Sequence, residues 1–251
     1  MRSGNPALGE NTFLDIGSGR VVSRDGSTMT LNGTVNKSGI LLALILVSAS
    51  FVWGKYDGPA SAPAVMPWLM TGAIGGFVLA LITVFKKEWA PVTAPIYALL
   101  EGLFLGGISA YYEARFPGIV MQAVGLTFGT LAALLMAYRS GLIRATENFK
   151  LGVVAATGAI FLVYLVSWIA GFFGKSIPFI HESGLLGIGF SLFVVIIAAL
   201  NLVLDFDFIE DGVEQGAPKY MEWYGAFGLM VTLVWLYLEI LRLLSKLNSR
   251  N

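Results

Sequence analysis

The chain has 251 residues, of which 56% are apolar and only 13% are charged, and its mean hydropathy is +0.75. These values lie far from those of soluble proteins and indicate a protein with several membrane spans. The formal net charge of zero removes the electrostatic case for nucleic acid binding, and the absence of cysteine excludes disulfides, thiol catalysis and thiolate metal sites.

The beginning of the chain is polar. It is rich in glycine, serine, asparagine and threonine, and it lacks the apolar core of a signal peptide. We expect residues 1–36 to form a flexible polar leader. Residues 37–251 are then predicted to form a single transmembrane domain.

Seven apolar stretches follow the leader, each close to the roughly 20 residues that cross a hydrocarbon core as a helix. Their continuous apolarity predicts helices, because barrel strands would alternate with polar lumen positions. The expected fold is therefore an all-α membrane protein with seven transmembrane helices. The predicted spans are Ser38–Trp53, Val65–Phe85, Ala90–Tyr112, Gly118–Tyr138, Leu151–Phe173, Gly184–Leu204 and Trp223–Leu244.

Basic residues in the loops predict the orientation, since cytoplasmic loops carry an excess of lysine and arginine. The side with the leader holds Arg20, Arg24, Lys37, Lys86, Lys87, Arg139, Arg144, Lys150 and Lys219, and the other side holds Lys55, Arg115 and Lys175. We therefore expect a cytoplasmic N-terminus. Arg242, Lys246 and Arg250 oppose this rule, so a final segment that enters and leaves on one side stays an alternative.

Small residues recur at a spacing that favours helix packing. A G-x-x-x-G pair permits the backbones of two helices to approach closely. Three such pairs predict a tightly packed bundle, which we expect to be monomeric. The pairs are Gly72/Gly76, Gly102/Gly106 and Gly125/Gly129.

Acidic residues within the apolar spans are the main functional signal. A charged side chain near the middle of a bilayer is costly, so it normally faces a protein interior or a water-filled path. Asp205 follows the sixth span, Glu239 lies inside the seventh and Glu101 lies at the centre of the third. An ion or proton pathway is the leading hypothesis, with Glu101 and Asp207 as further acids along it.

Each acid also has a simpler interpretation. Glu101 could be a protonated carboxyl group that is hydrogen-bonded to a neighbouring helix. Glu239 could pair with Arg242, which lies three residues later on nearly the same helical face. Asp205 and Asp207 could belong to a solvated acidic loop, an interpretation that suits Asp207 better because apolar residues precede Asp205.

Catalytic sites find little support in the sequence. A zinc hydrolase needs several ligands, and the chain has one histidine, His181. Ser191 is a poor nucleophile candidate, because a serine protease needs a base within hydrogen-bond reach. Two intramembrane acids that share a proton could form an aspartyl protease, which stays an alternative. We expect the chain not to be an enzyme and to need no cofactor.

The chain resembles the Bax inhibitor-one family, also called the transmembrane Bax inhibitor motif family, in its bacterial seven-helix branch. The resemblance is strongest from Asn201 to Leu247, and Glu101-Gly-Leu-Phe-Leu-Gly and Met1-Arg-Ser-Gly-Asn-Pro also carry it. It implies six helices wrapped around a central seventh, and a place in the bacterial inner membrane.

The better-studied bacterial members are pH-sensitive calcium leak pathways gated by two aspartates, and the resemblance implies the same activity here. The sixth-helix aspartate matches Asp205, and its seventh-helix partner matches Glu239. These two acids are thus the predicted gating pair and the weak, transient Ca²⁺ ligands. Glu239 would lie about 24 Å along the helix from Trp223. Contact with Asp205 therefore requires the seventh helix to start later or to break.

A second class of function stays open. Besides the lipid bilayer and calcium ions, the partner could be a membrane protease or a cell-death protein that the bundle regulates without transport. The buried acids would then serve only packing. This alternative predicts no flux in purified vesicles.

Overall fold

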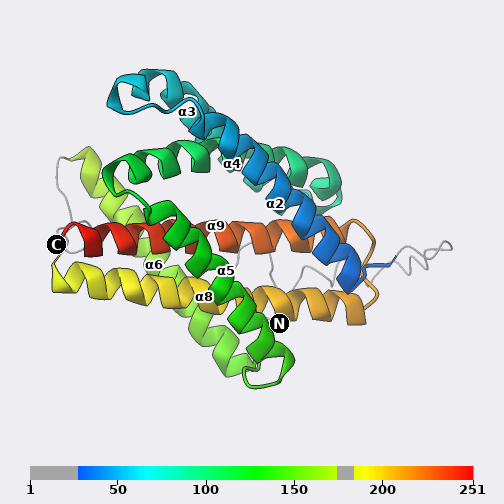
Figure 1. Ribbon diagram of the computed structural model, residues 1–251. Coiled ribbons are helices and arrows are strands. Elements are labelled where there is room, and N and C mark those ends of the chain that lie inside the picture. Colours follow the sequence, from blue (N-terminus) through cyan, green and yellow to red (C-terminus); the bar gives the residue numbers. More distant parts are fainter. Residues whose placement is uncertain (1–27, 174–183, 251) are drawn as a thin grey trace. The chain divides into compact units, whose positions relative to one another are not determined.

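The computed structural model describes residues 28–173 and 184–250. In this part of the chain seven helices are long and apolar enough to cross a membrane, so the expected all-α fold is confirmed (Figure 1). His181, Lys175 and most of the predicted leader lie outside the described residues, as do Arg20 and Arg24.

The seven long helices follow one another along the chain. The short 3₁₀ helices η2 (Pro59–Ser61) and η3 (Lys87–Trp89) precede the second and third of them. The long helices are α2 (Leu31–Trp53), α3 (Ala62–Phe85), α4 (Ala90–Arg115), α5 (Ile119–Arg139), α6 (Glu147–Phe172), α8 (Leu185–Glu214) and α9 (Met221–Asn248).

Several helices extend beyond the predicted apolar spans. The side chain of Thr30 caps α2 by accepting a hydrogen bond from the backbone N–H of Gly33, so the helix starts at Leu31 and includes residues 31–36 of the predicted leader. At the other extreme, α8 continues to Glu214. The interpretation of Asp207 as part of a loop is therefore wrong. An apolar run marks what the hydrocarbon covers, whereas a helix continues through polar residues until its hydrogen bonds end.

The described chain packs as two compact units. We call residues 28–117 with 208–231 the N-terminal unit, and residues 118–207 with 232–250 the C-terminal unit. The N-terminal unit holds α2, α3 and α4 with the end of α8 and the start of α9. The C-terminal unit holds α5 and α6 with the rest of α8 and α9. That residues 37–251 form a single domain stays a prediction.

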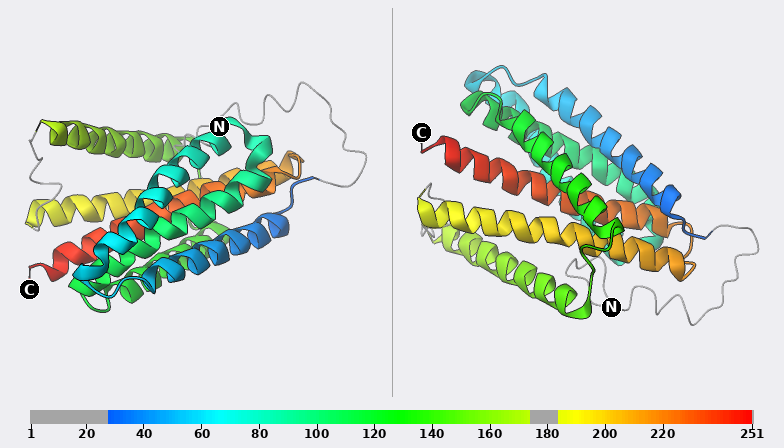
Figure 2. Two further views of the ribbon diagram at one scale, coloured as in Figure 1. Left: turned by 90° about the horizontal axis from the view of Figure 1, so that it is seen from above. Right: turned by 60° about the horizontal axis from the view of Figure 1, so that its bottom comes forward.

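Glycines bring α4 close to α2 and α3 in the N-terminal unit (Figures 1 and 2). A Cβ atom at Gly72 of α3 would lie 2.5 Å from the carbonyl oxygen of Leu100 in α4. One at Gly102 of α4 would overlap the hydroxyl of Ser48 in α2. Two of the three predicted G-x-x-x-G pairs therefore lie at helix contacts.

The third pair does not pack in this way. Within the described residues, a Cβ atom at Gly125 or Gly129 of α5 would meet no atom within 4 Å. The absence of a side chain at these two glycines is therefore not needed for any helix contact that the structure describes.

The helices differ in how much of their apolar surface the protein covers. For each helix we consider its most apolar window of 18 residues. The buried share of this window is 61% in α9, compared with 17% in α5 and 11% in α6. In the C-terminal unit, Trp235 of α9 packs against Ile160 of α6 and Val194 of α8. The helix that the resemblance places at the centre thus has the largest buried share of the seven.

We expect Gly102→Ala to destabilise the protein, because the added methyl group forces α4 away from α2. Overpacking of this kind costs about 1–3 kcal/mol of unfolding free energy. Thermal unfolding of the purified protein in detergent measures the effect, with Gly129→Ala as the matched control. Equal melting temperatures for the two variants would contradict the packing described.

Candidate functional site

Asp205 lies in α8 within the C-terminal unit, and its side chain is only 1% exposed. The residues on both sides of it in sequence, Leu204 and Phe206, are buried as well. Its carboxyl group therefore lies in the protein interior and does not face lipid, as the cost of a carboxylate in hydrocarbon requires.

Glu239 of α9 is 2% exposed and lies in a compact polar cluster. The hydroxyl of Tyr164 in α6 donates to both carboxylate oxygens at 3.1 Å. Nη1 of Arg242 lies 3.0 Å from Oε1 of Glu239 and donates to the Tyr164 hydroxyl at 2.6 Å. The three groups form a closed triangle, so the local ion pair that the i,i+3 spacing suggested is present.

Lys246 is the next charged residue along this face of α9, and it is buried at 5% exposure. Its ammonium group donates to the Ser191 hydroxyl at 2.8 Å and to the carbonyl oxygen of Gly187 at 3.0 Å, both in α8. Two of the three basic residues that oppose the loop-charge rule, Arg242 and Lys246, are thus bound to other groups of the protein.

The contact between Lys246 and Ser191 fixes the antiparallel register of α8 and α9. Asp205 lies about 21 Å along α8 from Ser191, and Glu239 lies about 10 Å along α9 from Lys246. The two carboxyl groups are therefore offset by about 10 Å along the helices. α9 runs unbroken from Met221 to Asn248, so the structure shows neither the later helix start nor the break that contact was expected to require. That Asp205 and Glu239 act as a pair stays a prediction.

Glu101 lies in α4 of the N-terminal unit. It shares a hydrogen bond with Tyr97, one turn earlier in the same helix. Its Oε2 also lies 3.1 Å from the position of a Cβ atom at Gly76, so the carboxyl group is placed where α4 meets α3. A role for Glu101 along an ion path stays a prediction.

Asp207 of α8 forms an ion pair with Lys150 of α6, at 2.6 Å between Oδ2 and Nζ. Lys150 is only 7% exposed and also lies 3.7 Å from Glu147, which begins α6. Asp207 thus joins the start of α6 to α8, which is a structural contact.

A third buried acid, Glu222, was not among the predicted site residues. It is fully buried at the start of α9 and accepts hydrogen bonds from the backbone N–H of Thr30 at 2.9 Å and from its hydroxyl at 2.8 Å. Lys219 Nζ lies 2.7 Å from it, and Lys37 of α2 completes the cluster. The spacing of Lys219 and Glu222 could have suggested one pair, but Thr30 and Lys37 are far away in sequence.

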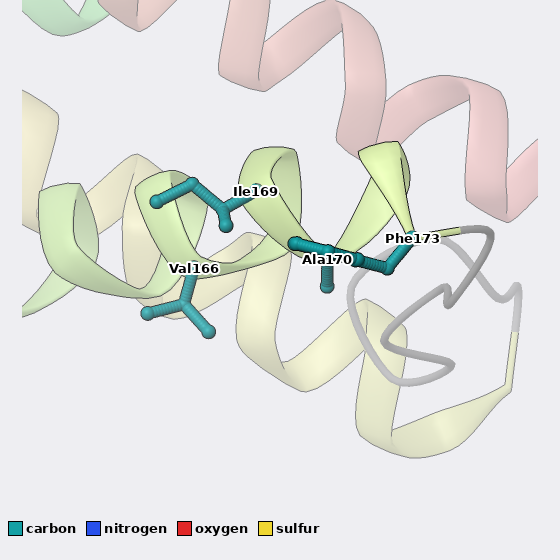
Figure 3. A pocket seen from close by; sticks show the side chains of 4 residues that line it. All are labelled: Val166, Ile169, Ala170 and Phe173. Carbon is teal, nitrogen blue, oxygen red and sulfur yellow. The ribbon is translucent and has the colours of Figure 1, made fainter.

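A shallow hollow lies at the end of α6 (Figure 3). Val166, Ile169, Ala170 and Phe173 line it, and all four side chains are hydrocarbon. These four side chains suit lipid acyl chains and carry no oxygen ligand for a cation.

We expect Glu222→Gln to lower the free energy of unfolding by about 3 kcal/mol, because it leaves two lysines beside a neutral group in a buried cluster. Unfolding in mixed detergent micelles measures the loss. Glu214→Gln, at the exposed end of α8, is the matched control. A loss no larger than that of the control would show that the cluster does not stabilise the fold.

The pairing of Glu239 and Arg242 can be tested by a double-mutant cycle. The protein covers Arg242 only in part, at 38% exposure, and we expect a coupling energy of about 1 kcal/mol. Arg242→Gln should destabilise the wild type more than it destabilises Glu239→Gln, with Arg250→Gln as the exposed control. Strictly additive changes in unfolding free energy would contradict the ion pair.

Comparison with known proteins bears on the whole chain. A family model described as Bax inhibitor 1 like matches residues 5–249. No curated protein and no solved structure matches the chain. Because the family model spans nearly the full length and seven helices are fit to cross a membrane, the chain is an integral membrane protein that belongs to the Bax inhibitor 1 like family.

Proposed function

We propose that this protein is a calcium leak pathway of the bacterial inner membrane that opens and closes with the protonation of Asp205 and Glu239. One observation carries the proposal: both acids are buried inside apolar spans of the same unit, at 1% and 2% exposure. Acids in such positions normally mark the path of an ion or a proton. Membership of the Bax inhibitor 1 like family supports this interpretation.

The protonation state supplies the gate. Neutral or ion-paired carboxyl groups are tolerated in an apolar interior, so the path is closed when Asp205 holds a proton and Glu239 is either protonated or held by Arg242. Loss of the protons places two negative charges in one unit, which draws in water and cations and separates the helices. The pH at which this occurs belongs to both acids if they interact.

Glu239 is bound by Arg242 and Tyr164, and it can exchange these partners for a cation. In the structure the guanidinium holds the carboxylate, and a Ca²⁺ ion competes for the same oxygens. The Arg242 side chain is 38% exposed and can turn away from Glu239 when the ion binds. Glu239 thus changes from an internal ion pair to a transient cation ligand.

Weak binding suits such a path. Two carboxylates supply fewer than the 6–8 oxygens that bind Ca²⁺ tightly, and a permeating ion must leave as well as enter. Within residues 28–173 and 184–250, no three His, Cys, Asp or Glu side chains gather to hold a metal ion. In this proposal Ca²⁺ is the transported ion and the protein is a passive pathway.

We further propose that the N-terminus is cytoplasmic, on the basis of the loop charges. The strongest objection to this orientation is the group of basic residues at the end of α9. The ion pair of Arg242 and the burial of Lys246 weaken that objection, because these charges serve contacts within the protein. Arg250 is the one of the three that is exposed.

A second candidate function is regulation of a membrane protease or another partner without transport. It is favoured by the closed triangle around Glu239, in which the carboxylate is satisfied as a purely structural role requires. An aspartyl protease is less favoured, because its two acids share a proton and the offset here is about 10 Å.

Calcium flux into dye-loaded proteoliposomes tests the proposal. The flux is measured across about pH 6 to pH 8, and we expect it to rise with pH in the native protein, because carboxyl groups lose their protons as the pH is raised. Asp205→Asn with Glu239→Gln should remove this pH dependence, whereas Glu214→Gln should behave as the native protein.

Two results would overturn the leak pathway. The first is no flux above that of empty vesicles from native protein that melts cooperatively, which favours the regulatory function. The second is a native flux that the double substitution leaves unchanged in size and in pH dependence.

A further inference from the structure

The ammonium group of Lys246 contacts oxygen atoms that could also bind a free cation. It is buried at 5% exposure, and its two described partners are oxygens of α8: the Ser191 hydroxyl at 2.8 Å and the Gly187 carbonyl at 3.0 Å. Lysine is rarely buried unless it is paired. Backbone carbonyl and hydroxyl oxygens are also the groups that replace the water shell of a permeating ion.

The position of Lys246 relates it to the proposed path. Glu239, Arg242 and Lys246 are spaced by three and four residues, so they follow one face of α9. Lys246 lies about 10 Å beyond Glu239 toward the end of the helix. It is close enough to interact electrostatically with both Glu239 and Arg242. A cation that leaves Glu239 along this face must pass the ammonium group.

We propose that Lys246 is a tethered cation that limits the passage of Ca²⁺ and determines the ion selectivity of the path. The inference rests on the proposed leak function and adds a residue to it. The ammonium group occupies the oxygen atoms of Ser191 and Gly187 and repels ions that approach them.

The charge of the ion makes this proposal specific. Electrostatic repulsion scales with the product of the two charges, so a fixed positive charge raises the barrier for Ca²⁺ twice as much as for K⁺. Removal of the ammonium should therefore increase the Ca²⁺ flux more than the K⁺ flux. A lysine that only holds α8 against α9 would have no such effect on selectivity.

The experiment measures Ca²⁺ and K⁺ flux in proteoliposomes for the native protein, Lys246→Met, Lys246→Gln and Lys246→Arg. We expect both neutral variants to raise the Ca²⁺ flux about tenfold and the K⁺ flux about threefold. The flux depends exponentially on the barrier, and the electrostatic part of the barrier is twice as large for Ca²⁺ as for K⁺. Gln can still donate a hydrogen bond to α8, so it separates lost charge from lost contact. Lys246→Arg keeps the charge and should stay near the native values.

Release of a large trapped dye reports whether a variant has merely become leaky. If the neutral variants leave both fluxes at native values, or raise Ca²⁺ and K⁺ equally together with dye release, the inference is overturned. If the native protein and every variant conduct no ion, the leak function itself fails. A native flux with unchanged selectivity in Lys246→Gln would refute only the role of Lys246.

Discussion

The structure depends on how the charged side chains of α9 are stabilised in an apolar environment. A carboxylate inside a span must find partners within the protein, because lipid offers none. Glu239 finds them in Arg242, one turn away on its own helix, and in Tyr164 on α6. This requirement fixes which face of α9 turns toward α6, and it places a titratable group beside a guanidinium that the protein covers only in part. The contact of Glu239 with Arg242 and Tyr164 thus contributes to stability and is also part of the proposed gate.

Each unit contains a further ionic anchor at a helix start. Glu222 begins α9 and binds Lys37 and the cap of α2 in the N-terminal unit. In the C-terminal unit, Lys150 near the start of α6 binds Asp207 of α8. These anchors are satisfied locally and need no ion from solution. They are a structural use of buried charge, whereas Asp205 and Glu239 are the acids to which the proposed gate is assigned.

Much of the fold could be predicted because the bilayer dictates the length and apolarity of its spans. The ends of helices were harder, since polar residues extend α2 back to Leu31 and α8 on to Glu214. In the site, the i,i+3 spacing suggested the pairing of Glu239 with Arg242, but Tyr164 could not be found from periodicity. The buried lysine of α9 and the anchor at its start join residues far apart in sequence, so only the folded chain reveals them.

The central claim is that Asp205 and Glu239 change protonation state within the membrane. Infrared difference spectroscopy of the protein in lipid detects the carbonyl band of protonated carboxyl groups directly. Our account predicts that this band disappears from the native protein as the pH is raised, and that the disappearing band is absent in Asp205→Asn/Glu239→Gln. Identical spectral changes in the two proteins would contradict the account, because the titrating groups would then lie elsewhere.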